Sequence, residues 1–175
     1  KPGQAVRDAL DRLLGDVKWS DFTGARSVAI AISDKTRPIP HHQLLPPLLE
    51  RLASLGIPDQ AIHFYVAGGT HPPMRPDEYS AILPAELPAR YQVVSHDPGA
   101  YDQMADLGMT SRGTPVQLFR PLVEADVRIC LGNLEFHWFA GFSGGAKAIL
   151  PGCASRATVI ANHTLMVRPG VGSAR

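Results

Sequence analysis

The chain has 175 residues, of which 45% are hydrophobic and 19% charged, and its formal net charge at pH 7 is +1. This composition is typical of one globular domain with a sizeable core; it excludes a disordered chain, and the charge gives no reason to expect a nucleic-acid partner. No apolar run approaches the roughly 20 residues of a membrane helix, the start lacks a signal-peptide core, and two cysteines suit a reducing cytosol, so a cytoplasmic protein is expected.

Helices and strands alternate in the predicted order of elements. A helix is expected over residues 4–14, with Gly15 as its stop, and another from Pro46 and Pro47 to Gly56. A short helix is expected over residues 77–83. Strands are expected over residues 27–32, 62–67, 91–94 and 127–131, and the first is apolar enough to be buried on both faces. This order predicts an α/β fold with an open, mainly parallel sheet flanked by helices.

Polar side chains follow three of the four predicted strands. Asp34-Lys35-Thr36-Arg37-Pro38 follows the first, Gly69-Thr70-His71 the second, and a loop that includes His137 and Lys147 the fourth. Ligands of open α/β sheets bind beyond the carboxyl ends of the strands. The sequence therefore predicts an active site at this edge.

Each of these segments also has a structural interpretation. Asp34 could cap a turn, and His71, between two glycines and two prolines, could be a turn residue. The segment Ser143-Gly144-Gly145 could be a flexible loop or could bring backbone N–H groups to a phosphate, but it lacks the spacing of known nucleotide-binding loops.

Other histidines and one cysteine are expected to have structural roles. His41 and His42 lie beside a helix start and are expected to be solvated. His63 is expected to lie in the core or at a sheet edge, and His96 to make a structural hydrogen bond. Cys153 is expected to be a small buried residue without chemistry.

The chemistry of the remaining residues narrows the options. Two histidines on separate loops can act as acid and base on opposite sides of a substrate. Arg37 can hold a carboxylate, and Lys147 can form a covalent link to a cofactor or stabilise a phosphate. His163 could bind a metal, although a single imidazole seldom holds one alone. These residues indicate an α/β enzyme that acts on a small anionic substrate.

Four motifs resemble the N-terminal domain of the nickel-dependent lactate racemase family. They are D-x-T-R-P at residues 34–38, G-T-H at 69–71, H-x-x-A-G-F-S-G-G-x-K at 137–147 and N-H at 162–163, in the family's order and at about its spacing. The resemblance covers residues from roughly 27 to 165. It implies that residues 1–175 are a cofactor-binding and catalytic domain without the C-terminal domain, which in this family closes over the site and contacts the substrate carboxylate.

The resemblance also implies a cofactor and a role for each site residue. The cofactor is a nickel-pincer nucleotide, pyridinium-3,5-bisthiocarboxylic acid mononucleotide with nickel, and the enzymes that make it are expected partners. Lys147 would tether it through a thioamide, and His163 would be the protein ligand to nickel. Asp34, Lys35, Thr36 and Arg37 would contact the cofactor, with Arg37 also near the substrate.

The family mechanism would use His71 and His137 as the acid/base pair. One histidine would remove the hydroxyl proton of a 2-hydroxy acid while the α-hydride moves to the cofactor. This leaves a transient 2-keto acid, and return of the hydride to its other face inverts the centre.

Two positions depart from the family pattern and leave the substrate open. Pro72 follows His71 where members often have a basic residue, and Ala146 precedes Lys147 where members often have Arg. The expected function is racemisation of lactate or a related acid. The alternatives are a sugar-acid epimerase of the same family and a non-catalytic module that binds a nucleotide or phosphate. A zinc hydrolase is a further alternative, although the sequence lacks H-E-x-x-H.

Overall fold

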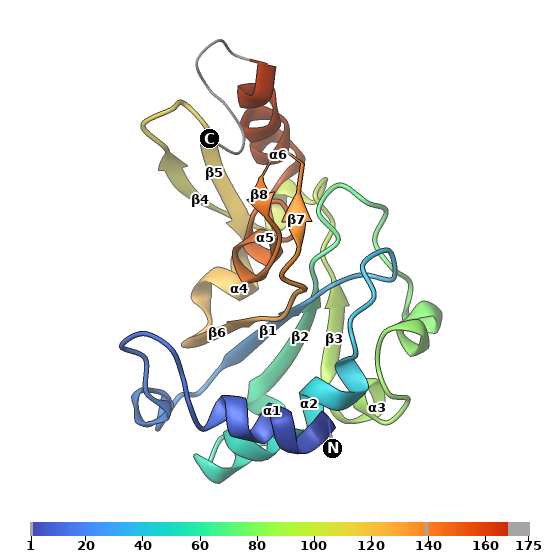
Figure 1. Cartoon of the computed structure of the whole chain (residues 1–175). Helices are drawn as coiled ribbons and strands as arrows, with labels where there is room; N and C mark the ends of the chain where they lie inside the picture. Colours follow the sequence, from blue (N-terminus) through green and yellow to red (C-terminus); the bar gives the residue numbers. More distant parts are fainter. Residues whose placement is uncertain (1, 139, 168–175) are drawn as a thin grey trace.

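A central sheet of four parallel strands organises the computed structural model, which describes residues 2–138 and 140–167 (Figure 1). The strands are β1 (Val28–Ile32), β2 (Ile62–Val66), β3 (Gln92–Ser95) and β6 (Val127–Cys130), in the order β3-β2-β1-β6. Val28 of the central strand β1 is paired with Ile62 on one side and Val127 on the other. The predicted α/β fold with a parallel sheet is confirmed, as are its four strands.

The two faces of β1 differ in the size of their side chains. Val28, Ile30 and Ile32 face a large core, built with Phe64 of β2 and with helix α2 (His41–Ser54). The η3 (Pro76–Ala81) and α3 (Leu87–Arg90) helices add to this core. Ala29 and Ala31 face a smaller core with Cys153, the α4 helix (Arg120–Glu124) and the partly buried end of α5 (Gly145–Ile149). The small alanines leave room for α5 to approach the sheet closely.

Helix α1 (Pro2–Leu10) packs on α2 and ends earlier than predicted. Arg7 donates to Glu50 at 2.7 Å, and Arg51 of α2 pairs with Asp11. The indole N–H of Trp19 donates to the Leu10 carbonyl at 2.7 Å. A helix that continued to residue 14 would need that carbonyl for the N–H of Leu14. The backbone instead tightens after Leu10, where the Arg12 N–H donates to the Ala9 carbonyl at 3.1 Å.

Helix α2 begins at His41, five residues before the predicted start, and contains Pro46 and Pro47 in its interior. His41 shares a helical face with the buried Leu45, Leu48 and Leu52. Its side chain is only 2% exposed, and its Nδ1 lies 2.8 Å from the Ile82 carbonyl oxygen. The prediction that His41 is solvated is therefore wrong, because the helix directs it into the core. His42 is exposed, as expected.

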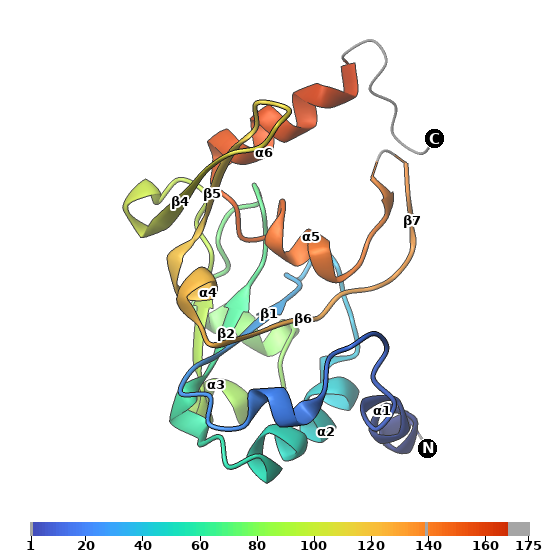
Figure 2. The ribbon, with the colours of Figure 1, turned by 90° about the vertical axis from the view of Figure 1, so that its left-hand side faces the viewer.

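Two antiparallel hairpins and helix α6 (Arg156–His163) lie beyond the carboxyl ends of the sheet strands (Figures 1 and 2). Strands β4 (Met104–Met109) and β5 (Pro115–Phe119) form the first hairpin, which packs against α6. Strands β7 (Phe136–His137) and β8 (Gly141–Phe142) form a shorter hairpin. The remaining short helices are η1 (Trp19–Phe22), η2 (Asp59–Ala61), η4 (Tyr101–Gln103) and η5 (Thr164–Val167).

The predicted helix over residues 77–83 is the 3-10 helix η3. Within the part of the chain that the structure describes, every helix is too short or too polar to cross a membrane.

Candidate active site

A cavity of about 330 Å³ lies at the carboxyl ends of β1, β2 and β6. Its volume is within the range of sites for small ligands. The loops after these three strands line it together with the β7–β8 hairpin, α5 and α6. Six of the eight predicted site residues line this cavity: Asp34, Arg37, His71, His137, Lys147 and His163. The prediction that the strand exits converge on one edge is therefore confirmed.

Asp34 and His71 are in direct contact across two strand exits. Asp34 is 5% exposed, and its Oδ2 lies 2.6 Å from Nδ1 of His71. Its Oδ1 accepts hydrogen bonds from the backbone N–H and the hydroxyl of Thr36, at 3.0 and 2.7 Å. The turn-capping interpretation of Asp34 thus holds, and the same side chain also contacts a predicted catalytic residue.

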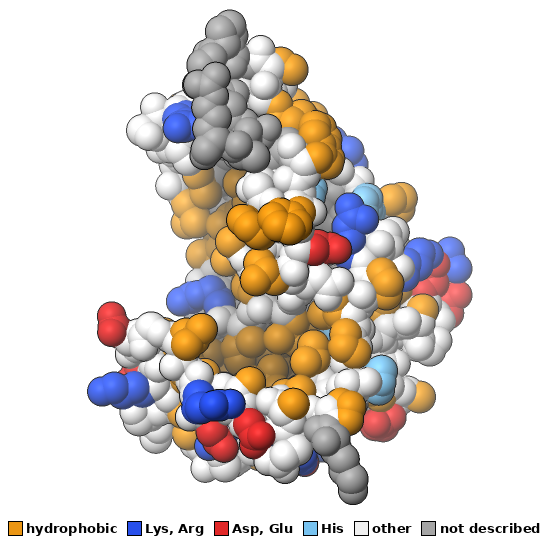
Figure 3. Space-filling model, in the orientation of Figure 1, with side chains coloured by type: hydrophobic (Ala, Val, Ile, Leu, Met, Phe, Trp, Pro, Cys, Tyr) orange, Lys and Arg blue, Asp and Glu red, His pale blue; other side chains and the backbone are white. Residues whose placement is uncertain are grey.

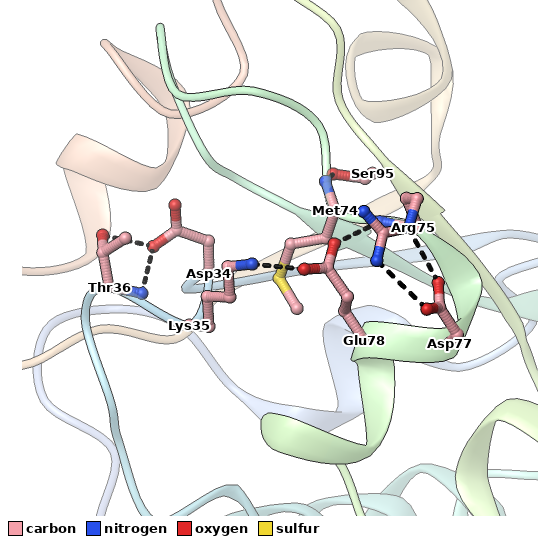
Figure 4. A network of polar contacts seen from close by, with 8 residues as sticks. All are labelled: Asp34, Lys35, Thr36, Met74, Arg75, Asp77, Glu78 and Ser95. Carbon is pink, nitrogen blue, oxygen red and sulfur yellow. Dashed lines mark hydrogen bonds and ion pairs between the residues drawn. The ribbon is translucent and has the colours of Figure 1, made fainter.

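Lys35 and Thr36 are not among the residues that line the cavity. Lys35 forms an ion pair with Glu78 of η3, as the close view shows (Figure 4). The Thr36 hydroxyl is engaged by Asp34. The structure therefore gives both residues protein partners, and their predicted cofactor contacts remain predictions.

Lys147 and His137 lie in a cluster of cationic side chains. Burial is the main cause that lowers the pKa of Lys147, and the nearby Arg37 guanidinium lowers it further. The pKa of His137 is lowered by desolvation and then by the charges of Lys147, Arg37 and His163. Lower pKa values favour a neutral amine and a neutral imidazole, which are the forms that act as nucleophile and base.

His137 stands on a hairpin with an apolar surface. Its ring is stacked on Trp138, with centroids 6.2 Å apart, and its Nδ1 accepts the Ala140 N–H at 3.2 Å. The rings of Phe136 and Phe142 pack against each other across the hairpin, with centroids 5.1 Å apart. The space-filling view shows hydrophobic side chains over this part of the surface, where Phe136 is 88% exposed (Figure 3).

The segment of residues 151–155, termed here the connecting segment, joins the elements that carry the site. The Gly152 carbonyl accepts the Gly69 N–H, and the Gly152 N–H donates to the Lys147 carbonyl, both at 2.9 Å. Ser155 caps helix α6, which ends at His163, by accepting the Thr158 N–H. The loop of His71 and the helices of Lys147 and His163 are therefore tied to one short stretch of backbone.

His96 and Cys153 have the structural roles that the sequence predicts. His96 is 1% exposed, and its Nε2 lies 2.9 Å from the Ala154 carbonyl oxygen in the connecting segment. Cys153 is fully buried, and burial raises the pKa of its thiol to about 12, which leaves it unreactive. His63 of β2 is partly buried, and this burial lowers its pKa.

Sequence reasoning missed the roles of Asn133, Glu135 and Ser143, which also line the cavity. The Ser143 hydroxyl donates to the Asn133 carbonyl at 2.7 Å and accepts the Glu135 N–H at 3.0 Å. It therefore closes the base of the loop that carries His137. For Asn133 and Glu135 the available signal was position, since they lie three and five residues after the end of β6.

The cavity residues fit the cofactor that the motifs imply. Among residues 2–138 and 140–167, no three His, Cys, Asp or Glu side chains are grouped so that they could hold a metal ion. A metal at His163 would thus take its other donors from a bound molecule, as a pincer cofactor provides. Lys147, whose pKa is lowered, lies in the same cavity as His163, and Arg37 adds a fixed positive charge for an anionic group.

These features define an α/β domain with a cationic, histidine-rich cavity at the strand exits. The sequence matches the family described as "Lactate racemase N-terminal domain" over residues 1–174, and the chain belongs to this family.

Two relatives are named lactate racemase. The chain is 36% identical over 162 residues to that of Lactiplantibacillus plantarum, covering 92% of this chain and 38% of the relative. It is 34% identical over 159 residues to that of Thermoanaerobacterium thermosaccharolyticum, covering 90% of this chain and 37% of the relative. The chain therefore spans less than two fifths of the length of these relatives.

Solved structures support the fold. The lactate racemase apoprotein from T. thermosaccharolyticum superposes with a TM-score of 0.90 at 31% identity, covering 99% of this chain and 42% of that one. A Thermotoga maritima protein superposes with a TM-score of 0.71 at 23% identity, covering 93% of this chain and 40% of that one. It shows similarity of fold alone.

Proposed function

We propose that this chain is the cofactor-binding and catalytic domain of a nickel-dependent racemase of lactate or a related 2-hydroxy acid. The observation that carries the proposal is the single cavity that collects Arg37, His71, His137, Lys147 and His163 from separate segments of the chain. Family membership supports the reaction class. Because the relatives are more than twice as long, the activity is proposed for the full-length protein.

The cofactor would be held by Lys147 and His163. Lys147 would supply its Nζ for a thioamide link, since its lowered pKa raises the fraction of neutral amine at neutral pH. His163 would supply one imidazole nitrogen to nickel. When bound, the nickel-pincer nucleotide would supply the site that accepts and returns a hydride.

The substrate would be oriented and deprotonated by three side chains. Arg37 would bind the carboxylate, for which its planar guanidinium offers two parallel N–H donors. His71 and His137 would lie on opposite sides of the substrate carbon, one removing the hydroxyl proton and the other returning a proton. Since each histidine would be the base for one enantiomer and the acid for the other, both are needed in both directions.

Native mass spectrometry of the full-length protein, expressed together with the cofactor-synthesis enzymes, tests the cofactor. A nickel-containing adduct at Lys147 is expected, and it should be lost in Lys147→Ala. His163→Ala should lose nickel while the fold, measured by circular dichroism, is retained. An apo mass for the full-length protein, with active synthesis enzymes, would contradict the proposal and favour a non-catalytic binding module.

Polarimetry with the loaded protein tests the reaction and separates racemase from epimerase. Racemisation of a single lactate enantiomer is expected, and His71→Ala or His137→Ala should impair it in both directions. Turnover of sugar acids without turnover of lactate would identify an epimerase instead.

A further inference from the structure

Asp34 was predicted as a cofactor contact, but both of its carboxylate oxygens already have protein partners. Oδ1 accepts the N–H and hydroxyl of Thr36, and Oδ2 lies 2.6 Å from Nδ1 of His71. Asp34 is 5% exposed, so water has little access to its carboxylate, whereas the His71 side chain is 46% exposed. The short distance and the burial indicate a specific carboxylate–imidazole pair.

The pair fixes where the protons of the His71 ring lie. An ionised carboxylate can only accept hydrogen bonds, so Nδ1 of His71 must carry the hydrogen that it donates to Asp34. In the neutral ring, Nε2 is then the nitrogen with a free lone pair. His71 lines the cavity, and Nε2 is the ring nitrogen not taken up by Asp34.

We propose that Asp34 is a positioning residue for His71, which holds the Nδ1–H tautomer and presents Nε2 to the substrate hydroxyl. The inference rests on the proposed function, because it assigns His71 the exchange of the substrate proton. Asp34 itself does not take up that proton. Its carboxylate stabilises the imidazolium that forms when His71 accepts one.

The loop that carries His71 has a second, independent anchor (Figure 4). Glu78 pairs with Lys35 and accepts the Arg75 N–H at 2.9 Å, and the Met74 N–H donates to the Ser95 hydroxyl at 2.9 Å. These contacts hold the far end of the loop without touching the His71 ring. Loop position and ring orientation can therefore be varied separately.

Nuclear magnetic resonance of the imidazole nitrogens tests the tautomer directly. In the wild-type protein, neutral His71 is expected to carry its hydrogen on Nδ1. Asp34→Asn is nearly isosteric, but its amide N–H₂ would face Nδ1 as a donor, so the hydrogen is expected on Nε2. Glu78→Gln, which weakens the Lys35 pair without contacting Asp34 or the His71 ring, should leave the wild-type tautomer. A wild-type ring with its hydrogen on Nε2 overturns the proposal, even if Asp34→Asn fails to fold.

Kinetics of the loaded full-length protein separate positioning from cofactor binding. Where an aspartate orients a catalytic histidine, its replacement by asparagine leaves the wrong tautomer and costs about 10⁴-fold in kcat. We expect kcat of Asp34→Asn to fall by about that factor, with unchanged nickel content and little change in KM. Loss of nickel from Asp34→Asn with an unchanged tautomer would make Asp34 a cofactor contact and overturn the proposal. If wild-type protein does not racemise, the proposed function fails, whereas the tautomer measurement still decides whether Asp34 orients His71.

Discussion

Gly152 lies where the connecting segment crosses helix α5, and a side chain there would collide with backbone. A Cβ atom on Gly152 would lie 2.4 Å from the Ala148 carbonyl oxygen and 2.8 Å from its carbon, whereas ordinary contact begins at 3.4 Å. Gly152→Ala would thus require a movement of about 1 Å. Because overpacking of this kind costs about 1 to 3 kcal/mol, we expect Tm to fall by roughly 2 to 12 °C.

The same movement would disturb the site, since the Gly152 N–H binds the Lys147 carbonyl. We therefore expect Gly152→Ala to retain less cofactor in native mass spectrometry. Gly145→Ala is the matched control, because its Cβ would meet only ordinary contacts, at 3.6 Å from Cys130. Calorimetry that shows Gly152→Ala to be no less stable than Gly145→Ala would refute the steric argument.

Three further predictions concern stability. Burial lowers the pKa of His41 and His96 below the ordinary 6.5, so in acid the unfolded chain binds more protons than the folded one. The free energy of unfolding should therefore be constant above about pH 6.5 and decrease below it. A urea midpoint that does not change from about pH 7 to pH 5 would contradict this. Ser155→Ala removes the N-terminal cap of α6 and should lower the free energy of unfolding, measured in urea, by about 1 to 2 kcal/mol. No change would mean that the cap does not stabilise the helix. Phe64→Ala in the core should cost about 3 to 5 kcal/mol, whereas the exposed Phe136→Ala should stay within about 0.5 kcal/mol; equal losses would contradict the assigned burial.

The sheet could be predicted from sequence because its signal is local and continuous. The strand at Val28–Ile32 is a run of apolar residues that only a sheet covered on both faces would bury. Convergence of the site residues could also be predicted, because the carboxyl ends of parallel strands lie at one edge of a sheet. The start of α2 was mispredicted because two prolines suggested a helix start, while the apolar face already includes His41.

The contacts within the site could not be predicted, because they join residues far apart in the chain. No sequence pattern relates Asp34 to His71, or Gly69 to Gly152. The carbonyl at the end of α1 accepts the indole N–H of Trp19, which lies outside the helix. The β4–β5 hairpin was missed because its strands are partly exposed and lack a continuous apolar run.

The dependence of the cavity on the connecting segment has a consequence for protein synthesis. The central strand β1 lacks one neighbour until β6, about 100 residues later, has left the ribosome. The loop of His71 gains its bond to Gly152, and the cavity gains the wall that holds His163, only after that. A nascent chain that carries Lys147 but has not reached residue 163 has no complete site. On the proposed function, attachment of a cofactor at Lys147 must therefore wait until residue 163 has emerged and this part of the chain has folded.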